Sequence, residues 1–127
     1  MTDLSPLGLD HVQVAAPAGS EDDARHFYGE LLGMPELPKP EALRARGGVW
    51  FACGGHQLHI GIAEPFVPAS KAHPALLIRM DELDPLAQRL GAAGCDVRWD
   101  DVIPGTRRFF TADPWGNRIE LVGADVR

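Results

Sequence analysis

The feature that most constrains the fold of this chain is an internal repeat of about 60 residues. Moving back 61 positions from Glu120 reaches His59, and the surrounding sequences match. The segment Gly116-Asn117-Arg118-Ile119-Glu120-Leu121 corresponds to Gly55-His56-Gln57-Leu58-His59-Ile60. Each segment begins at a glycine turn and then alternates apolar with polar residues, which is typical of a strand with one buried face. A repeat of this kind predicts two structural units of the same topology.

Two further pairs of positions extend the repeat. The same offset of 61 pairs Gly33 with Gly94, and each glycine follows a helical pattern. An offset of 62 pairs His11 with His73, and each histidine stands at the head of an apolar run. A chain of 127 residues is short enough for one compact domain, so we expect a single domain over residues 1–127. Its two repeats span about residues 8–63 and 73–123.

Each repeat has the pattern of a strand, a helix and three further strands. In the first unit we predict a strand over 9–15, an amphipathic helix ending at Gly33, an edge strand near 43–46, and a hairpin of strands 49–53 and 57–63. In the second unit we predict a strand over 73–80, a helix over 81–93, and strands near 97–99, 108–112 and 118–122. The segment 64–72 contains two prolines and is interpreted as the connector. Hairpin turns between consecutive strands favour antiparallel pairing, so the predicted class is α+β.

Four side chains that can bind a metal occupy matching places in the two units. They are His11, His59, His73 and Glu120, and each lies on the strand face opposite the apolar residues. A histidine in such a place is more often a structural residue, but four placed by one repeat favour a shared site. Imidazole and carboxylate groups suit zinc, nickel, iron, manganese or cobalt. Three or four protein ligands leave positions open for water or substrate on a six-coordinate metal, as a catalytic metal requires.

Charge and composition exclude several classes of partner. The net charge of −6 and the pI of about 5.2 argue against nucleic acid and against an anionic membrane surface. No apolar run approaches the ~20 residues of a membrane-spanning helix, and the N-terminus has no signal-peptide pattern. Cys53 and Cys95 have no metal-binding or redox spacing, so we expect reduced thiols and a cytoplasmic location.

Three motifs together give the chain a family resemblance. They are Leu9-Asp10-His11-Val12, His73-Pro74-Ala75-Leu76 and Asp113-Pro114-Trp115-Gly116-Asn117-Arg118-Ile119-Glu120-Leu121. The chain resembles the vicinal oxygen chelate superfamily, which includes glyoxalase I, fosfomycin-resistance thiol transferases, extradiol dioxygenases and bleomycin-resistance proteins. The resemblance implies two βαβββ modules that form a curved, mostly antiparallel, cup-shaped sheet around a divalent metal ion. By position, His11, His73 and Glu120 match the family's two histidines and glutamate, whereas His59 stands where glyoxalase I has a glutamate.

The resemblance implies a metal-dependent enzyme that acts on a small molecule with vicinal oxygens. Within this class, glyoxalase-like lyase or isomerase chemistry competes with ring-cleaving dioxygenation, and His59 and Glu120 are the candidate catalytic residues. The resemblance also implies a homodimer, and it leaves open whether modules pair within one chain or between chains.

Two alternatives remain for the function. A fosfomycin-type thiol transferase is favoured by basic residues that can meet an anion, namely Lys71, Arg107 and Arg108. A bleomycin-resistance-type protein binds its ligand without metal chemistry. Five aromatic residues are candidates for stacking on such a ligand: Trp50, Trp99, Trp115, Phe109 and Phe110. Aromatic residues are more often part of the hydrophobic core.

Overall fold

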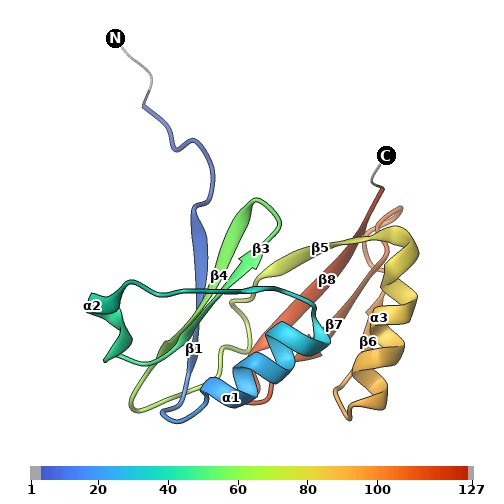
Figure 1. The fold of residues 1–127 in the computed structure, drawn as a ribbon. Helices are drawn as coiled ribbons and strands as arrows, with labels where there is room; N and C mark the ends of the chain where they lie inside the picture. The colour runs from blue at the N-terminus through green and yellow to red at the C-terminus, as the bar shows by residue number, and fades with distance from the viewer. Residues whose placement is uncertain (1–3, 126–127) are drawn as a thin grey trace.

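Each sequence repeat folds into its own four-stranded sheet in the computed structural model, which describes residues 4–125 (Figure 1). The first unit contains β1 (His11–Ala16), α1 (Glu21–Ala24), the π-helical segment η1 (Arg25–Leu31), β2 (Glu36–Leu37), α2 (Glu41–Arg44), β3 (Val49–Cys53) and β4 (His56–Ile62). The second contains β5 (Ala75–Arg79), α3 (Met80–Ala92), β6 (Arg98–Asp100), β7 (Arg108–Ala112) and β8 (Arg118–Ala124). The predicted α+β fold of two βαβββ modules is confirmed.

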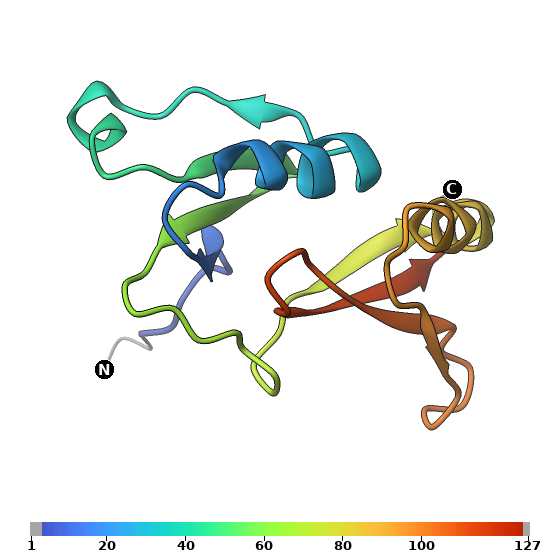
Figure 2. The same ribbon diagram turned by 90° about the horizontal axis from the view of Figure 1, so that it is seen from below.

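The two sheets have the same strand order, which explains why the sequence repeats. The order is β1-β4-β3-β2 in the first unit and β5-β8-β7-β6 in the second. In each sheet the first strand pairs in parallel with the last, and the other two pairs are antiparallel. The sheets are separate and do not close into a barrel (Figure 2). Strands β1 and β5 are therefore each an outer strand with one unpaired edge.

One hydrophobic core serves both units. It is built from residues on the helix-facing side of each sheet and from the helices themselves, including Phe27, Tyr28, Phe51, Leu58, Leu83, Leu90, Phe109, Ile119 and Leu121. The helical segments of the two units meet, and the Arg89 guanidinium donates a hydrogen bond to the Leu31 carbonyl oxygen at 3.2 Å. Since neighbouring residues of a strand face opposite ways, His59 and Glu120 point away from this shared core.

The turn between β7 and β8 joins the units through buried hydrogen bonds. The Asp113 carboxylate accepts bonds from the Tyr28 hydroxyl at 2.7 Å and from the side-chain amide of Asn117 at 2.8 Å. The same amide donates to the Ala15 carbonyl oxygen at 2.8 Å, and its oxygen accepts from the Ala69 N–H at 2.9 Å. Tyr28 and Ala15 belong to the first unit, so this turn is a structural joint as well as a hairpin.

One local prediction is wrong, and one helical segment is a π-helix, which is wider than an α-helix. Residues 43–46 form no edge strand: helix α2 covers Glu41–Arg44 after Pro40, whose fixed φ suits a helix start, and the edge strand is β2. In η1 the Leu32 N–H bonds to the Phe27 carbonyl oxygen, five residues earlier. No helix within residues 4–125 is long and apolar enough to cross a membrane.

Candidate functional site

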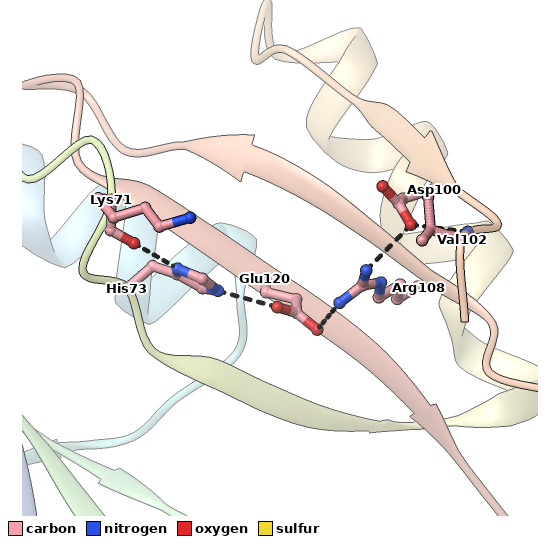
Figure 3. Close-up of polar contacts among 6 residues, drawn as sticks. All are labelled: Lys71, His73, Asp100, Val102, Arg108 and Glu120. Atoms are coloured by element: carbon pink, nitrogen blue, oxygen red, sulfur yellow. Dashed lines mark hydrogen bonds and ion pairs between the residues drawn. The ribbon is translucent and has the colours of Figure 1, made fainter.

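The second sheet carries a histidine and a carboxylate in direct contact (Figure 3). His73 lies just before β5 and Glu120 lies in β8, and strand pairing places Glu120 beside the start of β5. The His73 Nε2 atom lies 2.9 Å from Glu120 Oε1. Glu120 is only 7% exposed, so its carboxylate oxygens contact protein groups rather than bulk water.

Both ring nitrogens of His73 face oxygen atoms. The Nδ1–H donates a hydrogen bond to the Lys71 carbonyl oxygen at 2.8 Å, as Figure 3 shows. A neutral imidazole has a single N–H, so Nε2 then presents a lone pair to the Glu120 carboxylate. A cation between these two atoms, either a proton or a metal ion, satisfies both. A backbone carbonyl behind the distal nitrogen is also the usual support for a histidine that binds a metal.

An arginine holds the other oxygen of Glu120. Arg108 donates from Nη1 to Glu120 Oε2 at 3.1 Å and from Nη2 to Asp100 Oδ1 at 3.0 Å. The two carboxylates raise the pKa of Arg108. The Val102 backbone N–H, and then Arg108, lower the pKa of Asp100. Glu120 is thereby fixed in one orientation, with Oε1 directed at His73.

The first sheet carries a stack of three rings at the matching place. The His59 ring lies parallel to Trp50, with ring centroids 4.0 Å apart and planes 2° apart. His11 stacks on the other side of His59 at 4.2 Å and 17°. Burial, and then the nearby His11, lower the pKa of His59. His59 is therefore neutral near pH 7, and its Nε2–H donates to the Gln57 side-chain oxygen at 2.8 Å, which leaves Nδ1 as the acceptor.

The structure thus brings the four predicted site residues together as two pairs, His11 with His59 and His73 with Glu120. Within residues 4–125, no three histidine, cysteine, aspartate or glutamate side chains come close enough to hold one metal ion. Within one chain the described residues form these two pairs, and the convergence of all four residues on one metal stays a prediction. The two sheets share one core on their helix-facing sides, and each pair lies on the opposite face of its own sheet.

A groove with a volume of about 950 Å³ lies between the units, along the outer strands β1 and β5. His11 and His73, one from each pair, both line it, together with Gln13 and Arg118. Its wall includes three apolar side chains that are largely exposed: Leu9 at 70%, Val67 at 77% and Leu77 at 76%.

Sequence reasoning did not identify three polar residues of these faces, namely Arg118, Asp100 and Gln57. Strand alternation was enough to find Arg118, since it lies two residues before Glu120. Asp100 required knowledge of the β6–β7 register, which no local pattern contains. The other two histidines are exposed and lie outside the two pairs: His26 contacts Glu30, and His56 begins β4 at the hairpin turn.

Two βαβββ units with imidazole and carboxylate groups on their outer faces define the glyoxalase-like class of folds. The chain belongs to the Glyoxalase/Bleomycin resistance protein/Dioxygenase superfamily, whose sequence profile matches residues 8–121. A glyoxalase family protein from Bacillus anthracis is similar over 98% of this chain and 100% of its own, with 47% identity and a TM-score of 0.91.

More distant structures share the fold. Lactoylglutathione lyase from Agrobacterium tumefaciens has 20% identity and a TM-score of 0.72, covering 94% of this chain and 95% of its own. A variant of the fosfomycin resistance protein FosX from Listeria monocytogenes has 18% identity and a TM-score of 0.78, covering 96% and 95%. That FosX structure is a complex with Mn(II) and 1S,2S-dihydroxypropylphosphonic acid. No curated protein sequence matches this chain.

Proposed function

We propose that this protein is a divalent-metal-dependent enzyme with glyoxalase-like lyase or isomerase chemistry on a small molecule with vicinal oxygens. The observation that carries the proposal is the contact between His73 and Glu120. Two ligand atoms at ~2.1 Å from one metal and ~90° apart lie about 3 Å from each other. The separation of 2.9 Å between Nε2 and Oε1 suits this arrangement. The donor set of imidazole and carboxylate suits Zn, Ni, Fe, Mn or Co.

The protein groups around the pair have definite roles in this proposal. His73 and Glu120 hold the metal, and Arg108 keeps the Glu120 carboxylate oriented. When bound, the metal supplies Lewis-acid stabilisation of negative charge on the substrate oxygens. Glu120 acts in catalysis as the anionic ligand that adjusts the charge at the metal.

His59 is proposed to be the residue that accepts and returns a proton. Its lowered pKa keeps the ring neutral near pH 7. Its hydrogen bond to Gln57 holds the proton on Nε2 and leaves Nδ1 free to act as a base or as a further ligand. Proton transfer within the substrate is the central step of isomerase and lyase chemistry. This role for His59 favours that branch over dioxygenation.

We further propose that a homodimer completes the site. Each chain has one histidine pair and one histidine–carboxylate pair, and neither has three ligands. A two-fold axis that places the first sheet of one chain against the second sheet of its partner makes two identical sites, each with His11, His59, His73 and Glu120. The unpaired edges of β1 and β5 and the exposed apolar wall of the groove are surfaces that such a partner would cover.

Mixing two inactive variants tests this arrangement. His11→Ala and Glu120→Ala chains each lack a ligand in every site of their own dimers. After unfolding and refolding together, half of the dimers are mixed, and one of their two sites has all its ligands. We therefore expect about one quarter of the wild-type metal occupancy to return at limiting zinc. Sites built within one chain would regain nothing. If the wild-type protein itself binds no stoichiometric metal, the better-supported function is that of a bleomycin-resistance-type protein, which binds its ligand without metal chemistry.

A further inference from the structure

We propose that Arg118 binds an oxyanion group of the substrate, a carboxylate or a phosphonate, beside the metal site. This inference rests on the proposed function, which places the reacting atoms of the substrate at the metal. The contact between Arg118 and the anion needs only one chain. It assigns a substrate class, namely small acids with vicinal oxygens.

The position of Arg118 follows from strand geometry. Arg118 lies two residues before Glu120 in β8, so both side chains are on the same face of the sheet. Its cross-strand partner in β7 is Ala112, whose small side chain leaves room above the strand. Arg118 also lines the groove that His11 and His73 line.

An aromatic ring connects Arg118 to the histidine–carboxylate pair. The guanidinium carbon of Arg118 lies 4.1 Å from the centroid of the Phe110 ring. The same ring meets His73 edge-on, with centroids 5.7 Å apart. Stacking on a ring holds a guanidinium in place while its N–H groups remain free in the plane of the group. Arg118 is therefore a positioned cation next to His73.

The hydrogen-bonding capacity of Arg118 is unused. Within the described part of the chain its side chain donates no hydrogen bond and has no carboxylate within 4.0 Å, and its Nε is buried without a partner. Arg108, on the same face, is different because both of its terminal nitrogens are bound to Asp100 and Glu120. A guanidinium has five N–H donors in a fork that matches carboxylate and phosphonate oxygens.

The charges of this face also call for an anion. Asp100 and Glu120 offset only two of the three positive charges of Arg98, Arg108 and Arg118, which share this face through the β6–β7 and β7–β8 registers. A divalent metal at Glu120 adds two positive charges, which an anionic substrate group offsets. Among the described residues of this face, Arg98 and Arg118 both lack a carboxylate within 4.0 Å, but Arg118 lines the groove and stacks on Phe110 whereas Arg98 does neither, so the substrate anion is assigned to Arg118.

Anion binding by the metal-free protein tests the proposal separately from catalysis. After treatment with a chelator, the protein is titrated with methylphosphonate and with acetate, and the Arg118 Nε–H resonance is followed by NMR. The uncharged counterparts are dimethyl methylphosphonate and acetamide. We expect the anions alone to shift this resonance. Arg118→Gln should weaken anion binding about tenfold or more, and Arg118→Lys should retain part of it.

Arg107→Gln is the matched control. Arg107 lies in the segment just before β7 and is already paired with Asp84, so its loss should leave anion binding unchanged. The proposal is overturned if wild-type protein binds neither anion, if Arg118→Gln binds methylphosphonate as wild type does, or if binding requires zinc and persists in Arg118→Gln. A protein that binds anions through Arg118 but binds no zinc would overturn the proposed function alone.

Discussion

Replacing Asn117 with alanine removes the side chain that joins the two units. Asn117 is 2% exposed and makes three side-chain hydrogen bonds, to Ala15, Ala69 and Asp113. The change leaves a backbone carbonyl and a backbone N–H without partners, and it removes one of several donors to the Asp113 carboxylate. Each orphaned buried group costs about 1–3 kcal/mol, so we expect a loss of roughly 3–5 kcal/mol in the free energy of unfolding. A domain stabilised by about 5–15 kcal/mol would become marginal.

Urea unfolding of the metal-free protein, followed by circular dichroism, measures this loss. The matched control is Gln88→Ala, which removes an amide side chain from the exposed face of α3 and should change stability by no more than about 0.5 kcal/mol. Asn117→Asp should be worse than alanine, because it turns a donor into a second carboxylate oxygen facing Asp113. A loss below about 1 kcal/mol for Asn117→Ala would refute the view that this turn holds the units together.

Three further predictions concern other parts of the chain. Tyr28 is the sole tyrosine, and its burial, together with its hydrogen bond to the Asp113 carboxylate, raises its pKa well above 10. Tyrosine in the unfolded chain ionises near pH 10, so the free energy of unfolding should fall above that pH. Phenolate absorbance should then appear only as the protein unfolds. Gly48 has a φ of +90°, and a Cβ added there would lie 2.2 Å from a backbone carbonyl oxygen. Gly48→Ala should therefore lower the melting temperature several-fold more than Gly55→Ala, where no heavy atom lies within 4 Å of the added Cβ. Glu120→Gln should lower metal affinity at least about tenfold and abolish the melting shift on chelation, whereas the exposed-turn variant His56→Gln should change neither.

The structure changes what we expect of Glu120→Gln in one respect. Strand alternation alone predicts no loss of stability, because Ile119 and Leu121 face the core and Glu120 does not. The carboxylate is nevertheless buried against Arg108, so its removal leaves that guanidinium with Asp100 as its single anionic partner. We therefore expect a stability cost of about 1–3 kcal/mol in the metal-free protein.

The sequence by itself was sufficient for the features that depend on local periodicity. Alternation along β4 and β8 assigned His59 and Glu120 to the face opposite the core, and the repeat predicted two units with one topology. These predictions succeeded because a strand's side-chain direction is a property of each residue and its immediate neighbours.

The tertiary structure decided everything that depends on contacts between distant segments. The β7–β8 register brought Arg108 to Glu120, and the division into two sheets placed the histidine pair on one sheet and the histidine–carboxylate pair on the other. The Asp113–Asn117 motif, which the sequence suggested only as a family signature, became a joint because Tyr28 and Ala15 fold against it. Such contacts arise from the packing of side chains far apart in the chain, and no local pattern of residues specifies them.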